Sequence, residues 1–173
     1  MTPSDVDRLL AYESIRQLVA RYALALDARD LDTLVGLFVT DVRVGNDVGR
    51  AALRHSFETS LRAIGVSILN TGTHVIDLVD DTHATGTLYC KAEIQDFERW
   101  IHQAIAYEDL YRRDDGRWYF VRRVHRLFYG AEVGTSPIGL PPANWPDQHT
   151  GWGTVPGGWE TWKRFVDEGE EPQ

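Results

Sequence analysis

Apolar residues recur at helical spacing through the first part of the chain. Ser4 followed by Asp7 is typical of a capping box at a helix start. An apolar stripe follows at Ile15, Leu18, Val19, Tyr22 and Leu26. The pattern predicts an amphipathic helix over residues 5–28. It also predicts a short second helix that Asp30 caps and that ends near residue 40, and a third helix over residues 51–64.

The types of residue in the sequence change after Gly65. Four stretches are rich in β-branched and aromatic residues, namely 66–79, 84–94, 100–112 and 118–129. Turn signals such as Asp114-Asp115-Gly116 separate them, which indicates antiparallel hairpins. Helices first and a meander of strands afterwards predict an α+β fold, in which the N-terminal helices cover the concave face of a strongly bent antiparallel sheet.

The composition shifts again near Gly130, towards Gly, Pro and Trp. We therefore divide the chain into a domain over residues 1–130 and a tail over residues 131–173. The tail carries four tryptophans, Trp145, Trp152, Trp159 and Trp162, and one helical segment near its end. Because so much apolar surface is costly in water, we expect the tail to pack on the barrel or on a partner subunit.

Charge and cysteine content exclude several classes of function. Lys and Arg total 18 against 26 Asp and Glu, a net charge of -8, so nucleic acid is not an expected partner. The arginines at 112, 113, 117, 122, 123 and 126 are interpreted as solvated hairpin edges. Cys90 is the only cysteine and no long apolar run occurs, so we expect a cytoplasmic protein with no membrane partner.

Three polar side chains remain as candidates for chemistry. Tyr22 and Asp27 lie on the first helix, about 140° apart, so both can border one cavity only if Asp27 lies at the helix end. His74 lies within the first long strand, on a face with Asn70, Gly72, Ile76 and Leu78. Each has a structural alternative: Tyr22 as a core aromatic, Asp27 as an exposed partner of Arg29, and His74 as a satisfied core histidine.

The three candidate residues are part of a resemblance to a known protein family. It is carried by Tyr22 and Asp27 in "RYALALDARDLDTLVGLFVTD", by "THVIDLVDDTHATGTLYCKAE" and by "YEDLYRRDDGRWYFVRR". The chain resembles the SnoaL-like branch of the nuclear-transport-factor-like superfamily, close to scytalone dehydratase and bile-acid dehydratase. The resemblance implies a cone-shaped α+β barrel with a mixed-edge sheet, in which Tyr22, Asp27 and His74 match the catalytic roles. It also implies a second acid, for which the candidates are Glu93, Gln95, Asp96 and His102.

The resemblance implies a lyase or isomerase of the dehydratase or polyketide-cyclase type, acting on an apolar hydroxy-ketone-like substrate. Asp27 would hydrogen-bond His74, whose free nitrogen would remove a proton next to a carbonyl while Tyr22 steadies the oxygen. Tyr89, Tyr107 and His125 are expected to line the binding pocket. No cofactor and no metal are expected. The alternatives are a carrier or sensor of a hydrophobic ligand, or a dimerisation module.

Association between subunits is the last expectation from the sequence. An open sheet leaves its outer face to solvent, and Ile101, Ile105, Trp118 and Phe120 are plausible outward residues. Apolar residues on both faces of the strands favour burial by another chain. We therefore expect a homo-oligomer.

Overall fold

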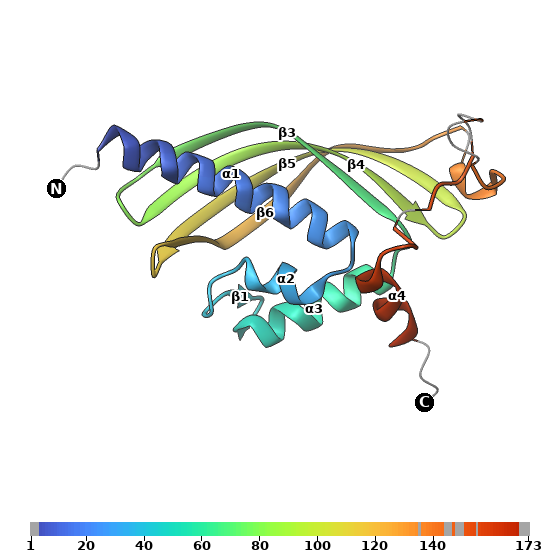
Figure 1. Cartoon of the computed structure of the whole chain (residues 1–173), viewed down its shortest axis with the longest axis horizontal. Coiled ribbons are helices and arrows are strands. Elements are labelled where there is room, and N and C mark those ends of the chain that lie inside the picture. The colour runs from blue at the N-terminus through green and yellow to red at the C-terminus, as the bar shows by residue number, and fades with distance from the viewer. Residues whose placement is uncertain (1–3, 135, 144–146, 148–150, 155, 170–173) are drawn as a thin grey trace.

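The computed structural model describes residues 4–134, 136–143, 147, 151–154 and 156–169. Helix α1 spans Asp5–Asp27 and runs along one side of the sheet (Figure 1). Its first turn carries the predicted capping box, since Ser4 Oγ accepts the N–H of Asp7 and the Asp7 carboxylate accepts the N–H of Ser4. These contacts satisfy N–H groups that a helix end leaves unpaired, so the helix begins where the sequence predicts.

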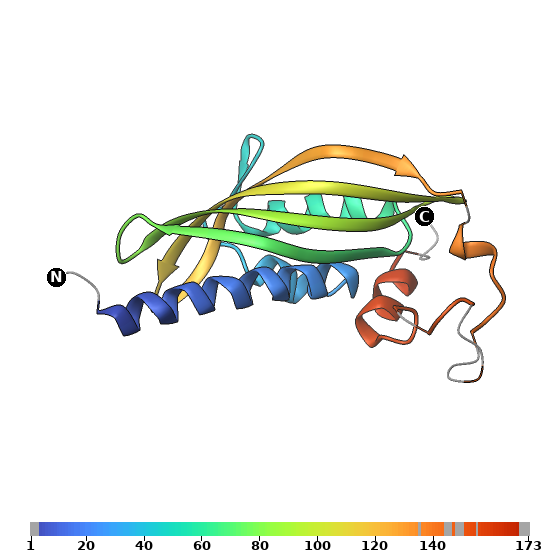
Figure 2. The same ribbon diagram turned by 90° about the horizontal axis from the view of Figure 1, so that it is seen from above.

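Four long strands form the sheet. They are β3 (Ser67–Leu78), β4 (His83–Asp96), β5 (Arg99–Asp114) and β6 (Arg117–Glu132), and each pairs antiparallel with its sequence neighbour. An isolated parallel bridge joins Phe38 to Phe120 on the edge strand β6. Figure 2 shows the strands running side by side and bending along their length. The predicted α+β fold with a bent antiparallel sheet is confirmed.

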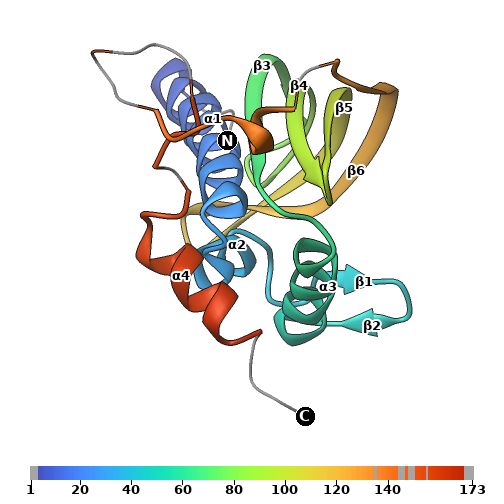
Figure 3. The ribbon, with the colours of Figure 1, turned by 90° about the vertical axis from the view of Figure 1, so that its right-hand side faces the viewer.

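The remaining N-terminal elements close the concave side of the sheet. Helix α2 spans Leu31–Gly36, the hairpin of β1 (Arg43–Val44) and β2 (Asp47–Val48) follows, and α3 spans Arg50–Arg62. Figure 3 shows α2 and α3 below the curved strands. Aromatic rings from helices and sheet meet in the core, with ring centroids of Tyr22 and Phe120 5.7 Å apart.

A bulge divides β3 into two halves, and the alternation of inward and outward side chains is reversed between them. The pairing with β4 shifts between Thr71 and His74. Ser67 is buried before the shift and Ile76 after it, whereas Asn70 and Gly72 are exposed. The prediction that Asn70 and Gly72 share a face with His74 is therefore wrong, because an extra residue in one strand reverses the alternation.

Three of the four residues expected on the outer face of the sheet lie in the core instead, whereas Ile101 is partly exposed. Ile105, Trp118 and Phe120 are 2%, 7% and 0% exposed and belong to the core, so their placement on the outer face was wrong. The outer face instead exposes Tyr89 and Phe128, whose rings pack edge to face with centroids 5.4 Å apart. Shifts in the β5–β6 pairing change the inward and outward positions along β6.

The described part of the tail lies against the sheet and the N-terminal helices. A short helical turn, η1, spans Pro137–Gly139, and helix α4 spans Glu160–Asp167. The rings of Trp152 and Trp100 meet edge to face, with centroids 6.0 Å apart. Trp145 lies outside the described residues. None of the helices in the described ranges has the length and apolar character needed to cross a membrane.

Candidate functional site

Asp27 lies where α1 ends and faces the start of β3. Its Oδ2 accepts the backbone N–H of Leu69 (2.9 Å) and its Oδ1 accepts the hydroxyl of Ser67 (3.1 Å). Asp27 is 9% exposed. Burial raises the pKa of this carboxyl to about 6, although the hydrogen bonds from Leu69 and Ser67 and the charge of Arg29 act in the opposite direction. The group can therefore both take up and release a proton near neutral pH.

Arg29 shares a partner with Asp27. Its Nη1 donates to Ser67 Oγ (2.8 Å) and to the carbonyl of Leu26 (2.7 Å), and its Nη2 donates to the carbonyl of Gly65. Burial lowers the pKa of Arg29 to about 10, and the charge of Asp27 partly offsets that effect. No ion pair joins the two side chains, so the alternative of an exposed Asp27–Arg29 pair is wrong.

His74 belongs to a second polar network. Its Nε2 lies 3.2 Å from Tyr111 Oη, and the Tyr111 hydroxyl donates to Asp109 Oδ2 (2.7 Å). Because the one phenol hydrogen is committed to Asp109, His74 Nε2 must be the donor to Tyr111, which leaves Nδ1 unprotonated in the neutral ring. Burial lowers the pKa of His74, so the neutral form predominates at neutral pH.

A buried ion pair anchors this network. Arg123 Nε and Nη2 donate to the two oxygens of Asp109 at 2.8 and 2.7 Å. The guanidinium also lies over the rings of Tyr22, Tyr107 and Phe120, with Cζ 4.3 to 4.5 Å from their centroids. Burial opposes its charge, but the hydrogen bonds and charge of Asp109 outweigh burial, so the pKa of Arg123 is raised. Its Nη1 has no hydrogen-bond partner among the described residues.

The structure does not pair Asp27 with His74. Asp27 contacts Leu69, and His74 lies five residues further along β3, roughly 15 Å at the usual rise of a strand. The predicted hydrogen bond between them is wrong, because Asp27 binds Ser67 and Leu69 at the start of β3, whereas His74 contacts Tyr111 on β5. Asp27 and His74 thus belong to two separate polar networks.

Two phenols and a thiol occupy the interior between these groups. Burial raises the pKa of Tyr22 and of Tyr107, so both remain hydrogen-bond donors at neutral pH. Tyr107 makes no hydrogen bond to the described residues. Burial also raises the pKa of Cys90 to about 11, with Arg123 lowering it and Asp27 raising it further.

Two of the three expected binding residues meet. The ring centroids of Tyr107 and His125 lie 5.6 Å apart on neighbouring strands. Tyr89 lies on the outer face, 51% exposed, so its expected place in an interior pocket is wrong. The strand alternation explains the difference, because Leu88 and Cys90 on either side of it face the core.

The candidates for a second acid gather at the β4–β5 hairpin. Glu93 accepts the indole N–H of Trp100 (2.8 Å) and lies 3.5 Å from His102 Nε2. Gln95 accepts a backbone N–H near the start of β3, and Asp96 forms an ion pair across the turn. Each has a local structural partner, and none contacts Asp27 or His74.

The sequence interpretation missed the most buried charges. Asp109 and Tyr111 alternate with Tyr107 on the inward face of β5, where an aspartate within an aromatic alternation is an unusual signal. Arg123 was grouped with solvated arginines, yet its side chain is 4% exposed. The alternation could have indicated Asp109, and a buried carboxylate would in turn have required a cation.

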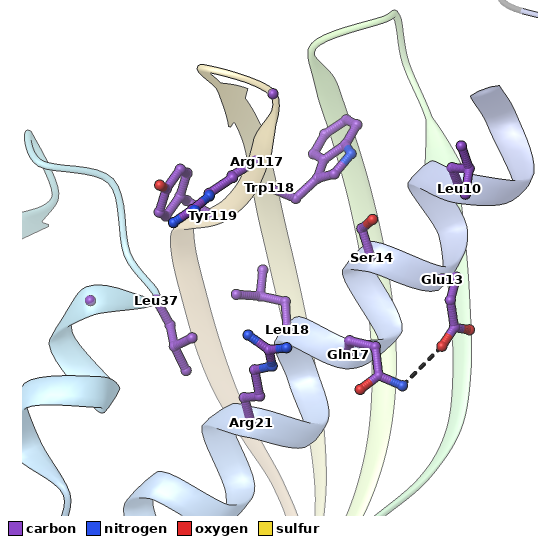
Figure 4. Close-up of a pocket in the computed structure, with 12 residues that line it drawn as sticks. Leu10, Glu13, Ser14, Gln17, Leu18, Arg21, Leu37, Arg117, Trp118 and Tyr119 are labelled. Carbon is purple, nitrogen blue, oxygen red and sulfur yellow. Dashed lines mark hydrogen bonds between the residues drawn. The ribbon is translucent and has the colours of Figure 1, made fainter.

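A groove of about 620 Å³ lies away from these residues, between α1, the end of α2 and the β5–β6 hairpin (Figure 4). Trp118 and Leu18 lie at its wall, and Gln17 donates to Glu13 along its helical side (2.9 Å). Neither Tyr22, Asp27 nor His74 lines it. Across the described ranges, no group of three or more His, Cys, Asp or Glu side chains is placed to hold a metal ion.

Comparison with known proteins establishes the family. Residues 7–124 match the model of the SnoaL-like domain, which is more than half of the chain. The protein therefore belongs to the SnoaL-like family, as its sequence resemblance suggested. No curated protein sequence matches the chain.

Solved structures agree with the fold. A candidate scytalone dehydratase of Novosphingobium aromaticivorans is 21% identical with a TM-score of 0.66, covering 77% of this chain and 94% of its own. The hexachlorocyclohexane dehydrochlorinase LinA-type3 of Novosphingobium barchaimii is 21% identical with a TM-score of 0.67, covering 76% and 95%. A nuclear-transport-factor-2-like protein of N. aromaticivorans is 27% identical with a TM-score of 0.59, covering 70% and 84%.

Proposed function

We propose that the protein is a cofactor-independent lyase or isomerase of the dehydratase or polyketide-cyclase type, acting on an apolar hydroxy-ketone-like substrate. The observation that carries the proposal is Asp27, a carboxyl 9% exposed whose pKa is raised to about 6. A group with a pKa near the working pH is an efficient proton acceptor and donor. The dehydratase and dehydrochlorinase among the similar structures support the same type of reaction, the loss of a small molecule from neighbouring carbons.

The first step is removal of a proton from the carbon next to a carbonyl. The Asp27 carboxylate accepts this proton, and the electron pair of the C–H bond moves towards the carbonyl oxygen as an enolate. Ser67 and Leu69 hold the carboxylate at fixed positions through one hydrogen bond to each oxygen. Each carboxylate oxygen retains a further lone pair for the proton.

The second step completes the elimination. The enolate expels the hydroxyl group on the next carbon, and the protonated Asp27 returns its proton to that group, so that water leaves and Asp27 is again a carboxylate. Tyr22 and Tyr107 stay protonated because burial raises their pKa, and they donate hydrogen bonds to the enolate oxygen. Isomerisation follows when the proton is returned to carbon instead.

His74 is the alternative base. Its Nδ1 is free in the tautomer that Tyr111 imposes, so it also has a lone pair to offer. Its lowered pKa makes it a weaker proton acceptor than an ordinary imidazole, and it lies in the second half of β3, away from Ser67 and Leu69, which bind Asp27. The proposal therefore gives proton transfer to Asp27 and a place in the wall to His74.

The test is turnover of a panel of cyclic and polycyclic β-hydroxy ketones, followed as loss of water by mass spectrometry. Asp27→Asn should lower kcat by roughly 10² to 10⁴, the usual contribution of a positioned base. Asp77→Asn is the matched control, because Asp77 is an exposed aspartate on the outer side of β3. If His74→Ala abolishes turnover while Asp27→Asn retains it, the assignment to Asp27 is wrong.

A carrier or sensor of a hydrophobic ligand is the second candidate. It is favoured by the absence of a hydrogen bond between Asp27 and His74, since a binding protein needs no coupled acid and base. A panel compound that raises the melting temperature without being converted would support this function over the first. A dimerisation module would show neither binding nor turnover, and would use the outer face around Tyr89 and Phe128.

A further inference from the structure

Helix α4 lies beyond the SnoaL-like match and next to the end of α1. The family model ends at residue 124, whereas α4 spans Glu160–Asp167. Figures 1 and 2 both place α4 beside the C-terminal end of α1, where Asp27 lies. A segment of the chain outside the common domain thus borders the candidate site.

Two side chains of α4 hold the turn that follows Asp27. The Thr161 hydroxyl donates to the carbonyl of Ala28 (2.8 Å). The ring of Trp162 lies over the Arg29 guanidinium, with Cζ 4.7 Å from the ring centroid. Arg29 is 2% exposed, so Trp162 helps to exclude water from it. The backbone of Arg29 has a φ of 56°, a left-handed conformation that such contacts must maintain in a non-glycine residue.

The contacts continue from α4 to the Asp27 carboxylate. Trp162 covers Arg29, Arg29 Nη1 donates to Ser67 Oγ (2.8 Å), and Ser67 donates to Asp27 Oδ1 (3.1 Å). The direction of each bond is fixed, because Arg29 can only donate and Ser67 has one hydrogen. With Arg29 occupying a lone pair of Ser67, the Ser67 hydrogen is available to Asp27.

A separate contact fixes α4 itself. Arg62 at the end of α3 donates to the carbonyl of Phe165 (2.9 Å), and its Cζ lies 4.4 Å from the Phe165 ring centroid. Phe165 is 8% exposed and belongs to the hydrophobic core. Helix α4 is therefore anchored at its far end independently of Trp162, so Trp162 can be altered while the helix keeps its other attachment.

We propose that α4 positions the reacting carboxyl: Trp162 and Thr161 are positioning residues that hold Arg29 and, through Ser67, orient Asp27. The proposal rests on the function given above for Asp27, and it assigns to the tail a role in catalysis. Loss of the Trp162 ring would admit water to Arg29 and loosen its hold on Ser67. Weaker contacts from Ser67 and Arg29 would by themselves raise the pKa of Asp27, but burial is the largest cause of its shift, so water that reaches the carboxylate by this route should lower the pKa towards the ordinary value of 3.8.

The experiment is a carbon-13 NMR titration of the aspartate carboxyls in the full-length protein, with the Asp27 signal assigned by its loss in Asp27→Asn. Trp162→Ala should lower the pKa of Asp27 from about 6 by about one unit or more. Trp162→Phe, which keeps an aromatic ring over Arg29, should restore most of the shift. Trp159→Ala is the matched control, because the Trp159 ring is not over Arg29 and is 37% exposed.

Activity separates this proposal from the proposed function. On a converted substrate, Trp162→Ala should lower kcat more than it raises KM and should move the acidic limb of the pH profile together with the pKa of Asp27. An Asp27 pKa unchanged in a folded Trp162→Ala, or in Trp162→Leu if the alanine variant does not fold, would overturn the positioning role. If the pKa responds but Asp27→Asn leaves turnover intact, the positioning stands and the proposed function fails.

Discussion

The ion pair of Asp109 and Arg123 offers a test of the interior that needs no substrate. Their side chains are 0% and 4% exposed, and two hydrogen bonds of 2.7 and 2.8 Å join them. Removing one partner leaves the other charge buried and unpaired, which costs about 3 to 5 kcal/mol. Asp109→Leu and Arg123→Met should each destabilise the protein by that amount.

Replacing both charges should cost far less than the sum of the two single changes. An apolar pair of similar volume avoids the desolvation of both ions, and such replacements are often close to neutral. In the double variant Tyr111 still has His74 as a hydrogen-bond partner. We therefore expect a coupling free energy of at least about 3 kcal/mol in the double-mutant cycle, above the usual range for neighbouring residues at exposed sites.

Urea denaturation measures these free energies directly, and thermal melting offers a second reading. For a domain of this size each kcal/mol corresponds to about 2 to 4 °C, so each single variant should melt roughly 6 to 20 °C below the wild type. Single variants that lose less than about 1 kcal/mol, or costs that simply add in the double variant, would refute the buried ion pair as the anchor of the network.

Three further predictions concern pH, packing and association. Because the folded pKa of Asp27 (about 6) exceeds its ordinary value of 3.8, the folded state binds the proton more tightly, and the free energy of unfolding should rise by about 1.4 kcal/mol from this group as the pH falls from 7 to 5. Urea titrations at the two pH values should show that Asp27→Asn removes this gain. An equal change of unfolding free energy with pH in both proteins would count against the prediction. Gly86→Ala should destabilise the protein, because the added Cβ would lie 3.0 Å from the Tyr111 ring and 3.2 Å from His74 Nε2. An unchanged melting temperature together with an unshifted His74 NMR signal would show that these side chains have room to move. If the outer face mediates the expected homo-oligomer, Phe128→Glu should shift sedimentation from oligomer to monomer, and a wild-type protein that sediments as a monomer would disprove the association.

The fold could be predicted because its signals are local. The capping box at Ser4 and the stripe ending at Leu26 both depend on residues a few positions apart, and the helix forms where they lie. The four strands likewise follow runs of β-branched and aromatic residues between turn signals. Each of these patterns reflects a preference for helix or strand that residues close together in the sequence determine.

The site could be predicted only in part because its partners are distant in sequence. Tyr22 and Asp27 are both buried, as the helical stripe and the position of Asp27 at the helix end allowed. The partner of Asp27, however, is Ser67, forty residues away. A bulge in β3 also breaks the strict alternation from which the facing of His74 was inferred. No periodicity indicates where an extra residue enters a strand, so the pairing of these groups could not be read from spacing.

Exchange of the α-proton of a bound ketone with deuterated solvent tests the central claim most directly, because proton removal is the step that all the proposed reactions share. The protein would be incubated in D₂O with the panel of β-hydroxy ketones, and deuterium at the α-carbon would be followed by proton NMR. The account predicts exchange or elimination for at least one compound with the wild type and with Asp77→Asn, and its loss with Asp27→Asn. A compound that binds tightly and keeps its α-protons at the uncatalysed rate, or exchange that survives in Asp27→Asn, would contradict it.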